Sequence, residues 1–230
     1  MNENIPRILL VSTRVTAGSV PLEIGFRAIT PKIIAGGPVE IEAFVINNSG
    51  SPLKLFISAD RLRLRPAQYS FEAYFEDILI DDPMADVPFM GGPEGNVIVS
   101  AENPWRQLIL LNEYVNLENL LHLMLNGTTG VMNLSCNYSL KYASIANDDL
   151  YQNEKVIQLK LSLKIYRDDE QLKKLSKKLY NDCLQKPLNT HSLSLLLSLR
   201  SAATDLIKKL IKHPNTDVAN QALLAYNSFF

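Results

Sequence analysis

Residues 155–166 read KVIQLKLSLKIY, and apolar side chains alternate with polar ones along most of this run. Successive side chains of a β-strand point to opposite faces, so the pattern predicts a strand with one buried and one solvated face. Residues 132–142, MNLSCNYSLKY, alternate in the same way. Strands of this kind are typical of antiparallel sheets that have one face in solvent.

The same alternation continues toward the N-terminus. PLEIGFRA, residues 21–28, places Leu, Ile, Phe and Ala on one face, and VEIEAFVI, residues 39–46, repeats the pattern. Asn47–Gly50 then predicts a turn before another alternating run that starts at Leu53. About eight short strands with Gly, Pro and Asn turns predict an antiparallel β-sandwich over residues 1–167.

The apolar spacing changes to that of a helix after residue 167. DDEQLKKLSKKLYNDCL, residues 168–184, places Leu172, Leu175, Leu179 and Cys183 on one helix face, while the lysines lie off that face. We expect a second helix from Thr190, as its cap, to Lys212, and a third capped by Asn215 or Thr216. Three such helices make a marginal core alone. Residues 168–230 are therefore expected to pack at least partly on the sandwich, giving a mainly β, α+β chain.

Composition and charge make several classes of protein less favoured. The chain has 230 residues, of which 47% are hydrophobic, and a formal net charge of -1. This balance disfavours a nucleic-acid partner, because proteins that bind nucleic acid usually carry a basic excess. No run approaches the roughly 18 apolar residues of a membrane span, so we expect no membrane insertion. The N-terminus lacks a basic signal-peptide region, which indicates a cytoplasmic protein, or an exported one whose leader has been removed.

Motifs that would indicate catalysis are missing from the sequence. HExxH, GxSxG, GxxxxGK(S/T), GxGxxG and CxxC do not occur, and the three histidines are far apart. Cys136 and Cys183 occupy apolar positions and are expected to be buried free thiols. We therefore expect no catalytic, cofactor-binding or metal site, no cofactor, and no enzyme. An alternative is a hydrolase or sugar-processing enzyme whose acids converge only in the fold, drawn from Glu72, Glu76, Asp77, Asp81 and Asp82.

Residues 61–66, RLRLRP, set three arginines two residues apart. On a strand they would share one face. We expect a hairpin in which 61–65 pairs with 72–76, so that cross-strand partners are Arg65 with Glu72, Arg63 with Tyr74, and Arg61 with Glu76. An anion or partner site is the alternative. A nucleic-acid surface is less favoured because several acids follow.

Two further features concern loops and the single tryptophan. The loop 81–96, DDPMADVPFMGGPEGN, carries apolar side chains at Met84, Val87, Phe89 and Met90. Such a loop either folds back on the sandwich or contacts a partner, and these residues form the candidate partner-contact loop.

Trp105 begins WRQLILL and is expected at the sandwich edge, partly buried, with Leu108 and Leu110 deeper.

Residues 20–166 resemble bacterial immunoglobulin-like (Ig-like) sandwich domains, found beside proteases and in small intracellular protease inhibitors. The resemblance rests on PVEIEAFVINNSGSPLKL, followed in order by FEAYFED, a Gly-Pro loop, WRQLILL, NLENLL and NGTTGVMNLSCNYSLKY. Residues 204–229, TDLIKKLIKHPNTDVANQALLAYNSF, resemble a HEAT-type helical pair. These resemblances imply an Ig-like fold with a helical appendage and supply no catalytic residue.

We therefore expect a non-enzymatic binding module whose partner is another protein. The alternatives are the hydrolase described above and, from the resemblance alone, a protease inhibitor. The sequence leaves the oligomeric state open.

Overall fold

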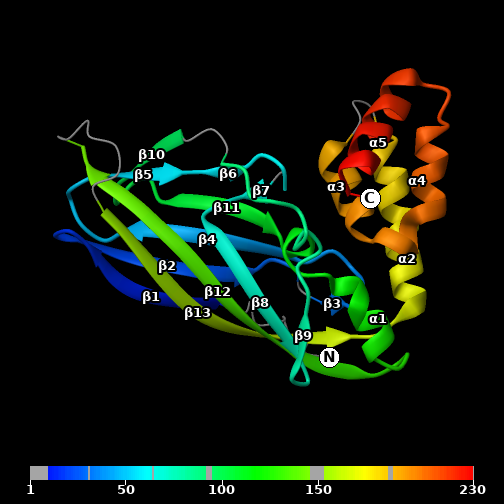
Figure 1. The fold of residues 1–230 in the computed structure, drawn as a ribbon, viewed down its shortest axis with the longest axis horizontal. Coiled ribbons are helices and arrows are strands. Elements are labelled where there is room, and N and C mark those ends of the chain that lie inside the picture. The colour runs from blue at the N-terminus through cyan, green and yellow to red at the C-terminus, as the bar shows by residue number, and fades with distance from the viewer. Residues whose placement is uncertain are drawn as a thin grey trace, which may run out of the picture.

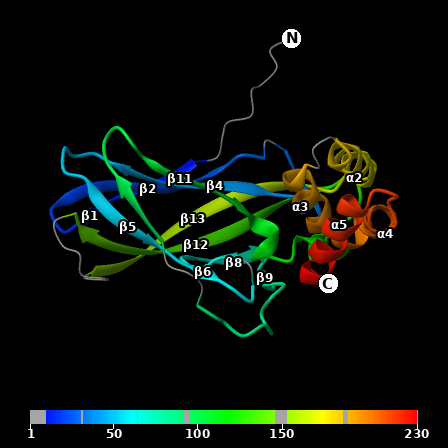
Figure 2. The same ribbon diagram turned by 90° about the horizontal axis from the view of Figure 1, so that it is seen from above.

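The computed structural model describes residues 10–30, 32–63, 65–91, 95–145, 153–185 and 189–229. The strands between residues 10 and 166 form two packed sheets, called here the strand region (Figure 1). The helices between residues 169 and 229, the helical region, gather at one end of it (Figures 1 and 2). The predicted mainly β fold with antiparallel sheets and C-terminal helices is confirmed.

The first sheet has the order β1-β2-β4-β11, and all its pairs are antiparallel. Its strands are β1 (Leu10–Ala17), β2 (Val20–Ala28), β4 (Glu40–Asn47) and β11 (Trp105–Leu110). The strands β1 and β2 form a hairpin whose turn contains Gly18 at a φ of 62°. A left-handed φ of this size favours glycine, since other residues meet a steric penalty there.

The second sheet is built around β12 (Thr129–Ser144) and β13 (Asn153–Tyr166), which pair along most of their length. The opposite side of β12 pairs with β8 (Tyr69–Phe75) and, farther along, with β5 (Leu53–Ile57). The remaining strands attach at the margins: β3 (Ile33–Ile34), β9 (Ile78–Ile80) and β10 (Gly95–Val99), of which β3 is parallel to β13. A separate short pair joins β6 (Ala59–Asp60) to β7 (Arg65–Pro66).

One apolar core lies between the two sheets. The expected alternation along β12 and β13 is confirmed, because the buried side chains are Met132, Leu134, Cys136, Tyr138 and Leu140 on β12 and Ile157, Leu159, Leu161, Leu163 and Ile165 on β13. From the first sheet, alternate residues of β2 and β4 enter the same core. Burial of each such side chain contributes about 1.5–3 kcal/mol, so this interface is the main stabilising feature of the strand region.

The side chains of β11 that point toward the core differ from those predicted. Trp105 is half-buried on an edge strand, as expected, and its ring stacks with Tyr69 and Tyr138. Leu108, expected to lie deeper, is instead exposed, and Ile109 is buried in its place. Because Trp105 and Gln107 point toward the second sheet, the alternation of a strand carries Ile109 inward and Leu108 outward.

The helical region contains α2 (Asp169–Cys183), α3 (Thr190–Ser198), α4 (Thr204–Ile211) and α5 (Thr216–Phe229). The single helix expected from Thr190 to Lys212 is wrong, because a 3-10 turn, η3 (Arg200–Ala203), separates α3 from α4. Arg200 in this turn has a φ of 48°, and Leu197 before the turn and Ile207 after it are buried in one core. The cap of α3 is Asn189 instead of Thr190.

The helical region has its own apolar core, to which Ile34 and Leu121 of the strand region contribute. Leu121 belongs to a short helical segment formed by η1 (Leu111–Glu113), η2 (Leu117–Asn119) and α1 (Leu120–Leu123). Polar contacts also cross the junction: Asn112 donates from Nδ2 to the Ser198 carbonyl at 3.5 Å, and His191 Nε2 lies 3.2 Å from Glu40 Oε1. Within the described residues, no helix has the length and apolar character that a membrane crossing requires.

The separate cores predict that the strand region folds alone. We expect the fragment 1–167 to unfold cooperatively, because its core is continuous without the helices. Loss of the cover over Ile34 and Leu121 should lower its thermal midpoint by about 5–10 °C. Scanning calorimetry of the fragment and the whole chain measures this, and a fragment without a cooperative transition would contradict the prediction.

Candidate functional site

The loop 81–91, called here the contact loop, projects away from both sheets after β9 (Figure 2). Phe89 is 65% exposed and Met90 50% exposed. Met84 and Val87 are half-buried. The structure therefore places two of the four predicted contact side chains in solvent and leaves the other two half-buried.

Asp60 fixes the far end of the contact loop. This residue is only 3% exposed, and its Oδ1 accepts hydrogen bonds from the backbone N–H groups of Leu62 and Arg63 at 3.2 Å. The same oxygen accepts from the Met90 N–H at 3.3 Å, while the Arg61 N–H donates to the Met90 carbonyl at 2.9 Å. The backbone beside Phe89 is thus tied to the turn that follows β6.

Arg63 fixes the middle of the contact loop. Its Nε and Nη2 both donate to the Val87 carbonyl, at 3.0 and 2.8 Å. Its Nε also lies 3.5 Å from Asp60 Oδ2, which compensates both charges. A hydrogen bond that involves a charged donor is stronger than a neutral one, so this contact holds the loop backbone more firmly than an amide pair would.

Arg65 fixes the near end and is itself 7% exposed. Its Nη1 and Nη2 donate to the two carboxylate oxygens of Asp82 at 2.9 and 2.5 Å. Nη1 also donates to the Glu113 carbonyl, and the guanidinium lies 4.4 Å from the centre of the Tyr114 ring. Asp82 in turn accepts from the Met84 N–H at 2.8 Å. A buried guanidinium is tolerated only with partners of this kind.

The predicted hairpin between 61–65 and 72–76 is wrong. Residues 61–63 form a turn, and β8 pairs with β12 and β9. Glu72, predicted opposite Arg65, lies on the solvent face of β8 and accepts a hydrogen bond from the Tyr74 hydroxyl at 2.9 Å. The backbone ladder of seven residue pairs that β12 offers to β8 outweighs exposed charge pairs of about 0.2–1 kcal/mol each.

The acids named for a hydrolase lie in different settings. The carboxylate of Asp82 is engaged by Arg65. Glu76 and Asp77 are exposed in the tight turn between β8 and β9, with φ of 47° and 65°. Asp81 and Glu72 are exposed on other surfaces. Among the described residues, no three His, Cys, Asp or Glu side chains gather in a way that could hold a metal ion.

Glu113 is an acid that the sequence did not single out. Desolvation by burial raises its pKa from 4.5 to about 7, although the nearby Arg65 charge opposes the shift. It lines a pocket of about 180 Å³ between β11 and α3, together with Glu40 and His191. The pocket lies at the junction of the strand and helical regions.

Both cysteines are free and buried, as predicted. Burial raises the pKa of the Cys136 thiol to about 12 and that of Cys183 to about 11. Only the thiolate is an effective nucleophile, so neither side chain has the character of a reactive cysteine at neutral pH.

Sequence reasoning found the exposed part of the contact loop and missed its anchors. A signal for Asp60 exists, because an aspartate that starts a turn often accepts from the N–H groups two and three residues later. The pairing of Arg65 with Asp82 spans 17 residues and carries no periodic signature.

No protein-family model matches this chain, and no curated protein matches it. A crystal structure of a protein from Archaeoglobus fulgidus is similar at a TM-score of 0.31 and 8% sequence identity, over 69% of this chain and 95% of that chain. A likeness this low carries no argument, so the function rests on the geometry of the site.

Removal of the Arg65 side chain should lower the stability of the fold. Arg65→Met leaves the partly buried Asp82 carboxylate without its partner, and we expect the free energy of unfolding to fall by about 3 kcal/mol. Arg61→Met, at an exposed arginine of the same run, should change it by less than about 0.5 kcal/mol. Urea unfolding of the two variants measures the difference, and equal effects would show that the Arg65 network does not stabilise the fold.

Glu113 should make stability depend on pH. Between pH 4.5 and about 7 the unfolded chain has released the Glu113 proton while the folded chain retains it, so this residue's contribution falls as pH rises. As pH rises across that interval, the free energy of unfolding of the Glu113→Gln variant should increase by about 1–3 kcal/mol relative to that of the native protein. The measurement is the difference between the two unfolding free energies at a series of pH values. A difference that stays constant with pH would contradict the assignment.

Proposed function

We propose that this chain is a non-enzymatic protein-binding module that contacts its partner through Phe89 and Met90. The observation that supports this most directly is the contrast between these two exposed side chains and the charged groups that hold the loop backbone, the buried Asp60 and the half-buried Arg63. A loop that only connected β9 to β10 would need neither the exposed apolar side chains nor the charged groups that hold the backbone. Exposed apolar side chains on a fixed backbone are typical of interaction sites.

The physical advantage of such a loop is a lower cost of binding. Ordering a flexible segment on association consumes free energy, and a segment that is already held avoids much of that cost. Aromatic residues and methionine are enriched at the centres of protein interfaces, where charged residues are depleted. Phe89 and Met90 fit a centre of this kind, and the exposed charges of Arg61 and Asp86 nearby fit its polar rim.

Inhibition of a protease is a second candidate. A projecting loop with a fixed backbone is what a rigid inhibitor presents to an enzyme, since such complexes form with little backbone movement.

We also propose that the strand region is Ig-like and that α4 and α5 correspond to a HEAT-type pair. Two sheets that are antiparallel except at β3, packed around one core, support the first relationship, and the helix–His-Pro-Asn–helix order supports the second. The hydrolase alternative gains no support from the positions of its acids.

A photo-crosslinking amino acid at position 89, with position 125 as the control, tests the proposal in cells that produce the protein. Leu125 is 78% exposed and lies outside the contact loop. A partner captured from position 89 and not from 125 is then purified for affinity measurements. We expect Phe89→Ser with Met90→Ser to weaken its binding at least about tenfold, since exposed interface anchors of this type dominate affinity.

The matched control carries Leu125→Ser with Val156→Ser, two exposed apolar side chains away from the loop, and should bind like the native protein. Equal affinity of the loop variant and the control would refute the proposal. If the purified partner is a protease, its residual activity at saturation decides between binding alone and inhibition.

A further inference from the structure

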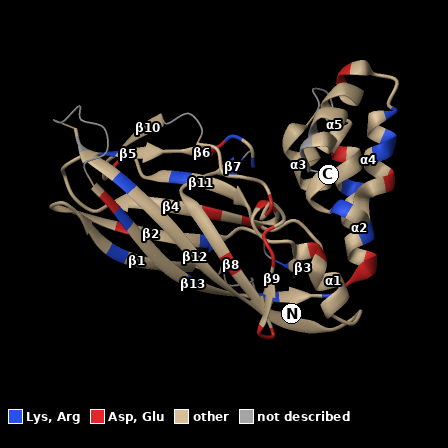
Figure 3. Ribbon diagram, viewed as in Figure 1, with Lys and Arg blue, Asp and Glu red and all other residues tan. Residues whose placement is uncertain are grey.

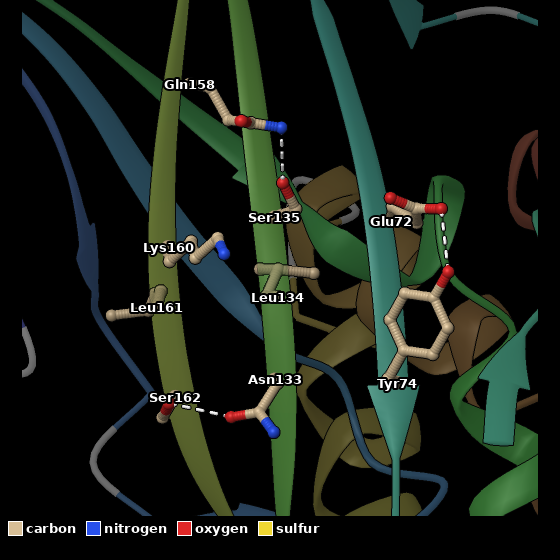
Figure 4. A pocket seen from close by; sticks show the side chains of 9 residues that line it. All are labelled: Glu72, Tyr74, Asn133, Leu134, Ser135, Gln158, Lys160, Leu161 and Ser162. Atoms are coloured by element: carbon tan, nitrogen blue, oxygen red, sulfur yellow. Dashed lines mark hydrogen bonds between the residues drawn. The ribbon is translucent and has the colours of Figure 1, made fainter. Parts of the chain in front are cut away.

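The solvent face of the second sheet carries a groove that the contact loop does not use. Its volume is about 430 Å³, and it is lined from three adjacent strands, β8, β12 and β13. Figure 4 shows Glu72 and Tyr74 on β8, Asn133 and Ser135 on β12, and Gln158 and Lys160 on β13. The Lys160 side chain reaches toward β12 (Figure 4).

The groove arises from unequal side-chain lengths across the sheet. In register, Ser135 lies between Glu72 on one side and Lys160 on the other, and Asn133 lies between Tyr74 and Ser162. At Ser135, on the central strand that forms the floor, a short side chain lies between two longer ones on the strands that form the walls, whereas at Asn133 the longer side chain is Tyr74 on β8 alone. The spacing of strands places the backbones of the two walls about 9–10 Å apart, which suits one sugar ring between them.

The floor is unusual for a central strand. Its outward positions between residues 133 and 139 are Asn133, Ser135, Asn137 and Ser139, where β-branched and aromatic residues would favour strand formation. The middle of β12 also carries no charged residue (Figure 3). These residues favour the strand less, and at successive outward positions they give the surface many hydrogen-bonding groups.

The groove offers both donors and acceptors and is close to neutral. Gln158 Nε2 donates to Ser135 Oγ at 3.1 Å, and Ser162 Oγ donates to Asn133 Oδ1 at 2.8 Å. One carboxylate, Glu72, and one ammonium group, Lys160, stand on opposite walls. The side chain of Lys160 makes no hydrogen bond or ion pair within the described part of the chain, so the three N–H donors of its ammonium group are open to a ligand.

One end of the groove is apolar. Tyr74 exposes part of its ring, and its cross-strand neighbour Leu79 on β9 is also exposed. Val131, two residues from Asn133 on the same face of β12, is exposed as well. An aromatic ring beside hydrogen-bonding groups is suited to a ligand that has one apolar and one polar aspect.

These features select among the possible occupants. A peptide strand would need free backbone groups, but those of β12 are paired with β8 and β13 on its two sides. A phosphate or another anion would meet the Glu72 carboxylate. A neutral carbohydrate offers hydroxyl groups that both donate and accept, and its C–H faces can pack on Tyr74. We propose that the groove binds a neutral oligosaccharide, independently of the contact loop.

The test uses the full-length protein and four neutral hexasaccharides as probes, built from glucose in β- and α-linkage, from xylose and from N-acetylglucosamine, with an oligogalacturonate as the acidic probe. Binding is followed by amide chemical shifts in a titration to millimolar sugar. We expect at least one neutral probe to shift the amides of Asn133, Ser135 and Lys160 saturably, and the acidic probe to bind at least tenfold more weakly.

Two variants separate binding from folding. Ser135→Tyr fills the floor of the groove with a residue that favours strands and should abolish binding, while Ser139→Tyr, outward on the same strand but outside the lining, should not. Tyr74→Ala should weaken binding at least tenfold, and Phe89→Ser should leave it unchanged. No binding by any neutral probe, shifts outside the groove, equal binding of the acidic probe, or equal behaviour of the two tyrosine variants would overturn the proposal.

Discussion

The burial of the Arg65 guanidinium is the constraint on which the site depends. A buried charge is costly unless a counter-charge and hydrogen bonds compensate it, and here Asp82, the Glu113 carbonyl and the Tyr114 ring do so. These partners bring β7, the start of the contact loop and η1 to one point. Because of this cluster the loop leaves β9 in a fixed direction. The cluster also places the Arg65 charge near the half-buried Glu113 carboxyl, whose pKa is raised by burial against the effect of that charge.

Two surfaces of the strand region differ in how they can bind. The contact loop presents apolar side chains whose backbone is held by Asp60, Arg63 and Arg65, an arrangement suited to a protein partner. The groove over β12 presents hydroxyl, amide and charged groups on a rigid sheet, an arrangement suited to a small polar ligand. A scaffold with both can join a protein to a carbohydrate, and the two interactions are separable by variants that lie on different strands and loops.

Periodicity predicted the parts of the fold that local pattern controls. The alternation along β12 and β13 and the helical spacing after Asp168 gave the mainly β class and the C-terminal helices, because burial selects side chains face by face. Features set by distant partners were missed: Arg65 meets Asp82 instead of Glu72, and the break at Arg200 has no Gly or Pro to mark it. The four candidate loop residues were found from their apolar character, and their role as a contact stays a prediction. The groove went unnoticed although Asn and Ser recur at the outward positions of β12.

We infer that Asp60, Arg63 and Arg65 hold the contact loop rigid in the free protein. The most direct measurement is the backbone N–H order parameter across residues 84–90, compared with that of β12. We expect values near the roughly 0.85 of a rigid backbone for Met84, Val87 and Met90, whose backbone groups meet Asp82, Arg63 and Asp60. Values below about 0.6 at these positions would mean that the loop is flexible and that these charged side chains do not hold it.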